Sequence, residues 1–307
     1  MLNTKDLLGL KGLPAQSIGG LLDAAAVMKK KITGAPKKLG GLTGKSVFLL
    51  FYENSTRTSS SFDHAVKILG GNSIGLAVKN SSVQKGETLI DTARTVDSLQ
   101  ADAIVIRHGA GGASALVARS VKASVINAGD GMNEHPTQAL LDMLTLKERF
   151  GALKGLKVAI IGDVKHSRVA RSNIYGLQTM GARVSVAAPR TLLPAGIERM
   201  GVTVCRTPKE AASGADAVMG LRLQLERQTG ALFPSVAEYS KYFGINDGVM
   251  AAAARHAVLL HPGPVNRGVE LSSALLDADQ SAVDTQVLNG LAVRMALLSI
   301  LITGKYE

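Results

Sequence analysis

The sequence predicts an α/β protein with two three-layer domains, each built on a mostly parallel sheet. Short apolar runs typical of buried strands alternate with longer segments of helical periodicity, a pattern that indicates parallel strands with helices on both faces. The alternation occurs in two series, which are separated at Phe150-Gly151. The length of 307 residues also fits two domains of ordinary size.

The first series ends at residue 149. Its helices are indicated by apolar residues at helical spacing, as at Phe62, Val66 and Leu69, after which two glycines end the helix. Its strands are short runs of apolar and β-branched residues. The expected strands are 46–51, 72–78, 102–107 and 124–127, and the expected helices are 18–31, 62–69, 88–99 and 137–149.

The second series begins near residue 151. It has one long helical pattern, 169–180, which ends at Gly181. A final helix, 290–302, is far from the first series in the sequence, but it is apolar enough to pack back onto the first domain. The expected strands are 157–161, 183–188, 202–205, 217–219 and 257–260.

Composition and charge exclude several classes of protein. Apolar residues make up 46% of the chain and charged residues 19%, so a folded core is expected rather than disorder. The net charge of +11 favours anionic partners. The densest basic run, at residues 29–31, has no aromatic residue beside it, whereas single-strand binders place stacking rings along a basic groove. A solvated helix end is the better interpretation, and no nucleic-acid partner is expected.

The single cysteine and the hydropathy pattern limit the cellular setting. Cys205 has no intrachain partner, which excludes a disulfide and a cysteine-based zinc cluster. The N-terminus lacks the apolar core of a signal peptide. No run reaches the roughly 18 apolar residues of a membrane span, and the most apolar segment, 291–303, carries Arg294. We therefore expect a soluble cytoplasmic protein without a membrane partner.

Three glycine-containing segments match known nucleotide motifs only in part. Residues 40–46 resemble a phosphate loop, but Leu39 stands where its first glycine belongs, and the segment precedes a strand instead of following one. Residues 109–114 lack the last glycine of a dinucleotide loop, and Gly162 stands alone in its turn. An NTPase and a nicotinamide enzyme are both disfavoured.

Residues 55–58, Ser-Thr-Arg-Thr, form the strongest local signal. They lie between an apolar strand and a helix, so that two hydroxyl residues and an arginine sit at a helix N-terminus. Free backbone N–H groups and the helix dipole favour an anion there, and Arg57 adds a fork of donors suited to phosphate oxygens. A helix cap is the alternative, although a cap by Ser55 or Thr56 needs no arginine.

Polar residues also follow two other strands of the first series. Arg107 ends the third strand, and His135 and Gln138 come shortly after the fourth. Ligands of parallel sheets bind at the carboxyl ends of the strands. We therefore expect these three residues to converge with residues 55–58 on one crevice.

These segments resemble the carbamoyltransferase family. Ser-Thr-Arg-Thr after an apolar strand and His-Pro-Thr-Gln at residues 135–138 are motifs shared by that family. Segments 81–87, 222–227 and 261–270 resemble the mobile loop, the aspartate-binding segment and the closing loop of aspartate carbamoyltransferase catalytic chains. The His-Cys-Leu-Pro segment of ornithine carbamoyltransferases is not found. The resemblance covers residues 51–270 in the order of the family.

The resemblance implies a reaction. Carbamoyl phosphate and L-aspartate give N-carbamoyl-L-aspartate and phosphate, which is the committed step of de novo pyrimidine (UMP) biosynthesis. Neither a metal nor an organic cofactor is implied. The alternatives are transfer to another amino acid such as ornithine, which would want a carboxylate in place of Arg222 and Gln224, and a non-enzymatic binder of phosphorylated ligands.

The resemblance also implies a role for each site residue. The carbamoyl-phosphate site comprises Ser55, Thr56, Arg57, Thr58, Arg107, His135, Gln138, Gly263 and Pro264. The aspartate site comprises Lys85, Arg168, Arg222 and Gln224, and domain closure is assigned to Glu53 and Arg227, with Arg168 also considered. Ser81 and Lys85 are expected to come from an adjacent subunit. The catalytic set is Arg57, Thr58, Lys85, Arg107, His135 and Gln138.

The resemblance finally implies an assembly. Residues 1–150, completed by a C-terminal helix at 290–307, would bind carbamoyl phosphate, and residues 151–289 would bind aspartate. The active site is expected in the interdomain cleft and shared across a homotrimer. Some members of the family are bare trimers, and others join larger assemblies with regulatory chains or another pyrimidine enzyme.

Overall fold

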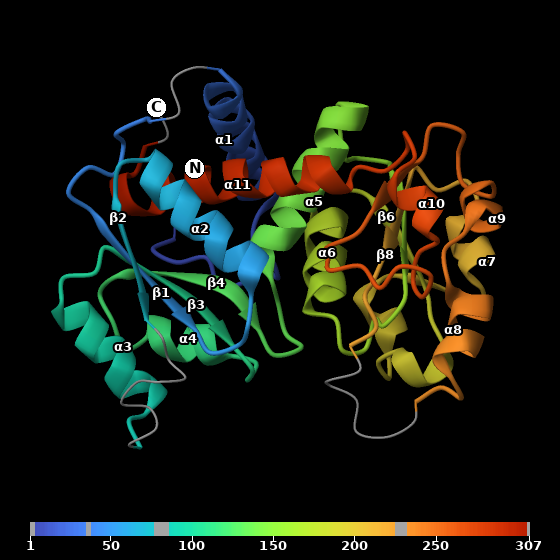
Figure 1. The fold of residues 1–307 in the computed structure, drawn as a ribbon, viewed down its shortest axis with the longest axis horizontal. Helices are drawn as coiled ribbons and strands as arrows, with labels where there is room; N and C mark the ends of the chain where they lie inside the picture. The colour runs from blue at the N-terminus through green and yellow to red at the C-terminus, as the bar shows by residue number, and fades with distance from the viewer. Residues whose placement is uncertain (1–3, 35–37, 77–85, 225–231, 306–307) are drawn as a thin grey trace. The chain divides into compact units, whose positions relative to one another are not determined.

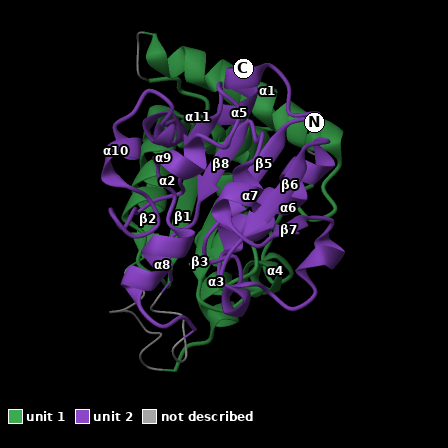
Figure 2. Ribbon diagram, turned by 90° about the vertical axis from the view of Figure 1, so that its right-hand side faces the viewer, with its two compact units in different colours: residues 1–144, 288–307 green, residues 145–287 purple. Residues whose placement is uncertain are grey.

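The computed structural model describes residues 4–34, 38–76, 86–224 and 232–305. The chain divides into two compact units, residues 1–144 with 288–307 and residues 145–287 (Figure 2). The division falls at Leu144, whereas the sequence pattern breaks at Phe150-Gly151. The reason is that helix α5 (Pro136–Phe150) is continuous across the division, so the end of its helical pattern does not mark the end of the unit.

The first unit contains a four-stranded parallel sheet in the order β2-β1-β3-β4. Strand β4 continues beyond its expected end at Asn127, because a register shift against β3 between Ile106 and His108 lets pairing extend to Asp130. The strands are β1 (Ser46–Phe51), β2 (Asn72–Leu76), β3 (Ala103–His108) and β4 (Ser124–Asp130).

Helices cover both faces of this sheet. Phe48 and Leu50 alternate with Val47 and Leu49 along β1, so both faces are apolar. The first pair belongs to a buried cluster with α3 (Leu89–Ser98) and α4 (Ala113–Ala118). On the opposite side lie α2 (Thr56–Ile68) and α11 (Val283–Thr303) (Figure 1). Helix α1 (Ala15–Thr33) and the part of α5 up to Leu144 complete the unit.

Helix α11 begins earlier than expected, at Val283, and its residues from Leu288 onward belong to the first unit. Ser124 Oγ of β4 donates a hydrogen bond to the Leu301 carbonyl, and Arg294 Nη1 donates to Ser61 Oγ of α2. Among the described helices, α11 alone is long and apolar enough to cross a membrane by length and composition. Because 67% of its most apolar window is buried in the fold, that composition fits a core helix.

The second unit contains a five-stranded parallel sheet in the order β7-β6-β5-β8-β9. Its five strands were all expected from the sequence. They are β5 (Lys157–Ile161), β6 (Arg183–Ala187), β7 (Thr203–Cys205), β8 (Ala217–Gly220) and β9 (Val258–Leu260). With the first sheet, they confirm the predicted fold class of two parallel α/β domains.

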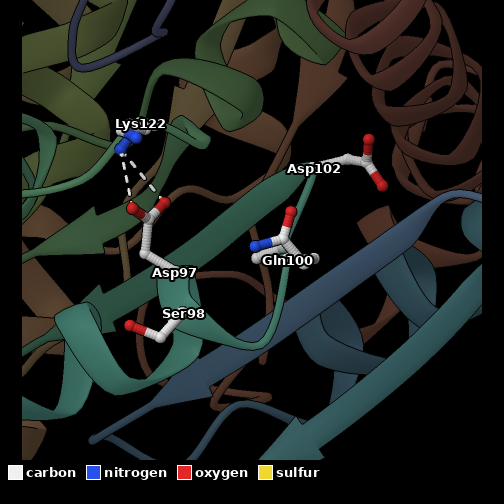
Figure 3. Close-up of a pocket in the computed structure, with 6 residues that line it drawn as sticks. Asp97, Ser98, Gln100, Asp102 and Lys122 are labelled. Carbon is white, nitrogen blue, oxygen red and sulfur yellow. Dashed lines mark hydrogen bonds between the residues drawn. The ribbon is translucent and has the colours of Figure 1, made fainter.

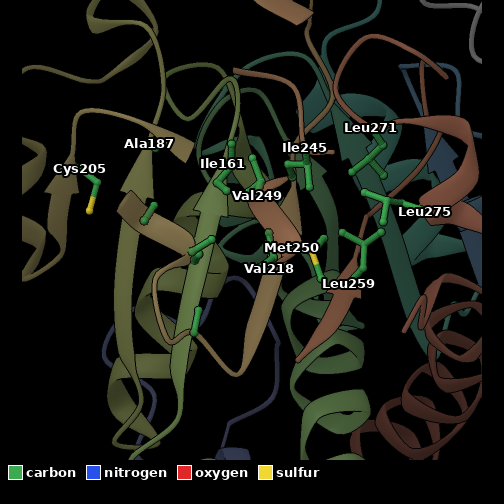
Figure 4. Packing of buried hydrophobic residues seen from close by; sticks show 14 residues of the cluster. Ile161, Ala187, Cys205, Val218, Ile245, Val249, Met250, Leu259, Leu271 and Leu275 are labelled. Atoms are coloured by element: carbon green, nitrogen blue, oxygen red, sulfur yellow. The ribbon is translucent and has the colours of Figure 1, made fainter. Parts of the chain in front are cut away.

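Helix α6 (Arg168–Thr179) follows β5, and several short helices cover a face of the sheet that the sequence left unassigned. The cluster in Figure 4 contains Val218 and Leu259 of the sheet together with Val249, Met250 and Leu275 of these helices. Three to eight residues are too few for a helical period to emerge from the sequence. The short helices are α7 (Pro208–Ala212), α8 (Val236–Phe243), α9 (Asp247–Met250), α10 (Ser273–Leu276) and the 3-10 turns Arg190–Leu192 and Ile197–Met200.

Candidate functional site

The Ser-Thr-Arg-Thr motif lies where the first sheet reverses its strand order. The chain leaves β1 for β2 on one side and returns to β3 on the other, and such a switch point opens a crevice at the carboxyl ends of the strands. Helix α2 begins there at Thr56, with Ser55 as its N-cap. The Ser55 side chain makes no capping hydrogen bond in the described structure, so the simple helix-cap interpretation loses its support. Thr58 is buried and Arg57 is exposed.

Arg107 lies at the same edge of the sheet, directly beside β1. Its carbonyl accepts a hydrogen bond from Tyr52 N at 2.9 Å, which places it next to the start of the β1–α2 connection. Its Nε is 3.5 Å from Glu53 Oε2, and its Nη1 donates to the Ala128 carbonyl at 3.5 Å. Arg107 is therefore oriented by groups of its own unit. Glu53, assigned to domain closure by resemblance, lies against Arg107 in this structure.

A network of buried polar groups supports the loop that leads to His135. The Asp130 carboxylate accepts hydrogen bonds from Gly112 N at 2.6 Å, Asn127 Nδ2 at 2.8 Å and Glu134 N at 3.1 Å. Glu134 in turn accepts from Leu10 N at 2.7 Å. The motifs in the sequence indicated no role for these acidic residues, although an Asn and an Asp at the end of a buried strand are a signal for such a loop.

His135 and Gln138 occupy the first turn of α5 and its approach. Both are buried, with 4% and 8% of their surface exposed. The His135 carbonyl accepts a hydrogen bond from Gln138 N at 3.0 Å, and Gln138 Nε2 donates to Asp142 Oδ1 at 2.9 Å. After β4, a backbone hydrogen bond therefore holds His135 at the start of α5, and a side-chain hydrogen bond holds Gln138.

The second unit has its own switch point, between β5 and β8. Buried Asp163 follows β5, and its carboxylate accepts from His166 N at 3.2 Å, lies 2.9 Å from His166 Nδ1, and accepts from Gln224 N at 3.3 Å. Arg168 opens α6 and is buried, whereas Arg222 after β8 is half-buried. Asp163 therefore joins the segment of Arg168 to the segment of Gln224, a link that the sequence analysis missed.

The loop at residues 261–270 is held by a buried histidine and a buried glutamate. His261 Nδ1 accepts a hydrogen bond from Gly263 N at 2.9 Å, which places the ring proton on Nε2. Nε2 is 3.6 Å from Glu270 Oε1, and the same oxygen accepts from Asn266 N at 2.7 Å. These bonds fix the backbone at Gly263. Burial, reinforced by the charges of Glu270 and Asp163, raises the pKa of nearby Tyr239, so its phenol stays neutral.

Three predicted residues, Ser81, Lys85 and Arg227, lie outside the residues that the structure describes. A pocket elsewhere in the first unit is lined by Asp97, Ser98, Gln100, Ala101, Asp102 and Lys122 (Figure 3). It lies at the edge where the strands begin, opposite the motifs. Its carboxylates accept backbone hydrogen bonds, Asp97 from Lys122 N and Asp102 from Ser46 N, which indicates a structural role. In the described part of the chain, no group of three His, Cys, Asp or Glu residues is arranged to hold a metal ion.

Comparison with known families gives matches over both units. The carbamoyl-P binding domain model of aspartate/ornithine carbamoyltransferases matches residues 5–148, and the Asp/Orn binding domain model matches residues 154–301. The chain is 58% identical over 300 residues to the aspartate carbamoyltransferase catalytic subunit of Ruminiclostridium cellulolyticum, covering 98% of this chain and 96% of that protein.

Two solved structures illustrate the similarity in three dimensions. Aspartate transcarbamoylase from Trypanosoma cruzi, in complex with N-(phosphonacetyl)-L-aspartic acid, has a TM-score of 0.86 at 35% identity, covering 96% of this chain and 94% of that one. Ornithine carbamoyltransferase from Thermus thermophilus has a TM-score of 0.86 at 29% identity, covering 98% and 99%.

Proposed function

Because the chain belongs to the aspartate/ornithine carbamoyltransferase family, we propose that it transfers the carbamoyl group of carbamoyl phosphate to L-aspartate. The products are N-carbamoyl-L-aspartate and phosphate, and the reaction is the committed step of pyrimidine biosynthesis. The observation that carries this proposal is the similarity, at 58% identity over nearly the whole chain, to a relative named for the aspartate reaction.

The phosphate group is assigned to the N-terminus of α2. The hydroxyls of Ser55, Thr56 and Thr58 and the guanidinium of Arg57 provide donors there, and the first turn of a helix adds unpaired backbone N–H groups and a positive dipole end. Arg107 at the end of β3 bridges the phosphate and the carbonyl oxygen of the substrate. These groups neutralise a dianion, which agrees with the net charge of +11.

Charge grows on the carbonyl oxygen when the aspartate amine attacks the carbonyl carbon. Thr58, Arg107 and His135 are assigned to donate to this oxygen, in the manner of an oxyanion hole. Their positions are fixed before the substrate arrives: Thr58 by burial in α2, Arg107 by Glu53, and His135 by its place at the start of α5. Preorganised donors of this kind need no rearrangement during the reaction.

The amide NH₂ of carbamoyl phosphate needs acceptors. Gln138 and the backbone carbonyls near Gly263 and Pro264 are assigned to it. Phosphate is a good leaving group and is able to take the proton of the amine, so that the protein mainly orients two anions against their repulsion. No nucleophilic side chain is assigned.

L-Aspartate is assigned to the switch point of the second unit. Arg168, Arg222 and Gln224 present cationic or amide donors, which suit two carboxylates. Ornithine has a cationic side chain, which these arginines would repel. Residues 1–150 with 290–307 would thus bind carbamoyl phosphate, residues 151–289 would bind aspartate, and Glu53 with Arg227 would stabilise closure.

Ser81 and Lys85 are assigned to the site of a neighbouring subunit in a cytoplasmic homotrimer. In this proposal Lys85 takes part in catalysis and in aspartate binding at the neighbouring site, so that an isolated chain would have no complete site. Such sharing requires a closed cyclic arrangement, in which each subunit both gives and receives the loop.

In the direct test, purified protein is incubated with carbamoyl phosphate and either L-aspartate or L-ornithine, and the carbamoylated amino acid is measured. Product with L-aspartate and none above background with L-ornithine is expected. Product with ornithine alone would overturn the assignment of the second substrate. Binding of carbamoyl phosphate without any transfer would support the non-enzymatic alternative.

A further inference from the structure

The side-chain amide of Gln138 is held by a carboxylate one helical turn further along α5. Its Nε2 donates to Asp142 Oδ1 at 2.9 Å, and Asp142 is fully buried. A carboxylate only accepts hydrogen bonds, so the amide must turn its NH₂ group toward Asp142 and its carbonyl oxygen away. Gln138 is therefore left with an acceptor to offer to a ligand.

A buried arginine of α11, Arg294, contacts the helix that carries the Ser-Thr-Arg-Thr motif. Arg294 is 4% exposed; burial lowers its pKa to about 10, and the negative charge of Asp142 acts in the opposite direction. The guanidinium remains charged at neutral pH. Its Nη1 donates to Ser61 Oγ at 2.9 Å, and its carbon lies 5.3 Å from the centre of the Phe62 ring. Both partners belong to α2, the helix that begins with the Ser-Thr-Arg-Thr motif.

Gly290, one turn before Arg294, leaves the space that this arrangement needs. A Cβ atom at Gly290 would lie 2.6 Å from Arg294 Nη1 and 3.0 Å from Leu141 Cδ2 of α5. Both distances are too short for ordinary contacts, so a larger residue would displace the guanidinium or separate α11 from α5. The close approach of the two helices and the position of the arginine therefore depend on each other.

We propose that Asp142 and Arg294 are positioning residues, which hold the Gln138 amide so that its carbonyl oxygen faces the NH₂ group of carbamoyl phosphate. The inference rests on the proposed function, since it takes carbamoyl phosphate as the ligand of Gln138. Stability alone is a poor explanation for two buried charged side chains, because well-packed apolar residues often stabilise a core as well or better. Asp142 holds Gln138 on α5, and Arg294 contacts α2, so the two residues act on the two helices that carry the carbamoyl-phosphate motifs.

The test compares two ligands that differ in the amide group. Asp142→Asn retains the shape of the side chain, but its new NH₂ group is able to donate, so the Gln138 amide is free to turn over and present a donor. Carbamoyl phosphate binding should weaken about tenfold, which corresponds to about 1.4 kcal/mol. Inorganic phosphate has no amide, and its binding should change less than twofold. Asp63→Asn, a change at a partly exposed residue of α2, is the matched control and should alter neither ligand.

A second arm tests whether Asp142 acts through Gln138. If it does, Asp142→Asn combined with Gln138→Ala should bind carbamoyl phosphate no more weakly than Gln138→Ala alone, within twofold. Additive losses in the combined variant would overturn the inference. Equal weakening of both ligands by Asp142→Asn would also overturn it, as general damage to the helices, and so would unchanged binding of both.

Replacing a single buried charged residue sometimes prevents folding. Asp142→Leu combined with Arg294→Met removes both charges and keeps the volume apolar, so the same ligand comparison is made on this variant, with the same expected selective loss. Wild-type protein that binds inorganic phosphate but not carbamoyl phosphate would overturn the proposed function together with this inference. Wild-type binding without a selective loss in the variants would overturn this inference alone.

Discussion

The two parallel sheets are built alike where their strands begin. In the first unit, Asp102 Oδ2 accepts a hydrogen bond from Ser46 N at 2.8 Å, at the start of the first strand. In the second unit, Asp216 Oδ2 accepts from Lys157 N at 2.8 Å, again at the start of the first strand of the sheet. Both aspartates stand just before a neighbouring parallel strand. The repeated arrangement indicates that these aspartates stabilise the starts of the strands in each sheet.

The sheets differ where their strands end. In the first unit, Arg57 and the N-terminus of α2 direct donors outward, which suits a phosphate dianion. In the second unit, the acceptor is the buried carboxylate of Asp163. It lies against the ring of His166 and accepts a hydrogen bond from the backbone N of Gln224. We therefore expect the first edge to bind its ligand with a helix terminus, and the second edge to bind its ligand with long side chains on an anchored loop.

The largest effect is expected from Arg57→Ala. Loss of a charged donor at the phosphate site should lower kcat/KM at least about 100-fold, or about 3 kcal/mol of transition-state stabilisation. The thermal unfolding midpoint should stay unchanged because Arg57 is exposed. Lys67→Ala, which removes an exposed cation from the same helix, is the control and should have normal kinetics. Near-normal turnover of Arg57→Ala would refute the phosphate assignment.

Arg222→Ala should affect the other substrate. We expect the KM for aspartate to rise at least about tenfold while the KM for carbamoyl phosphate changes little, because only a contact to aspartate carboxylate is lost. Steady-state kinetics with each substrate varied in turn makes the measurement. Arg199→Ala removes an exposed arginine of the same unit and serves as the control. Equal losses for both substrates would show that Arg222 is assigned to the wrong half of the site.

The shared site predicts recovery of activity from two inactive proteins. Lys85→Ala and Arg57→Ala chains are unfolded together, refolded as mixtures and compared with each parent. Random mixing makes about three quarters of the trimers mixed, each with one intact site in three, so about a quarter of all sites should recover. Activity no higher than the average of the parents, with mixed trimers demonstrated, would remove Lys85 from the catalytic set.

The smallest effect is expected where the two sheets are alike. Burial tends to raise the pKa of Asp216, but hydrogen bonds from Lys157 N and from His256 outweigh it and keep the pKa below its ordinary value. Its ionised form therefore stabilises the fold above about pH 4, and this contribution is lost as the pH falls through the lowered pKa.

Asp216→Asn should lower the free energy of unfolding at pH 7 by at most about 1 kcal/mol, because the group is partly exposed. Urea unfolding at pH 7 and at pH 3 should show that the Asp216→Asn variant loses less stability on acidification than the wild type does. Turnover should be unchanged. A large loss of activity would mean that this edge is not purely structural.

The sequence was most informative about elements with a clear apolar run or a compact motif. Apolar runs such as Ser46–Phe51 located the strands, and the motif at residues 55–58 located the start of α2. The short helices α7 to α10 were not predictable, because four to eight residues do not establish a period. The contacts of Asp163 and of Arg294 were also beyond reach, because they join segments that only folding brings together.

The most direct test of the central claim is binding of N-(phosphonacetyl)-L-aspartate, which joins the chemistry of both substrates in one molecule. If the two units act on one substrate pair, calorimetry should give a Kd at least about 100-fold lower than that of inorganic phosphate or L-aspartate alone. Arg57→Ala and Arg222→Ala should each lose most of this gain. Affinity no higher than that of inorganic phosphate, or full affinity in the Arg222→Ala protein, would contradict the account.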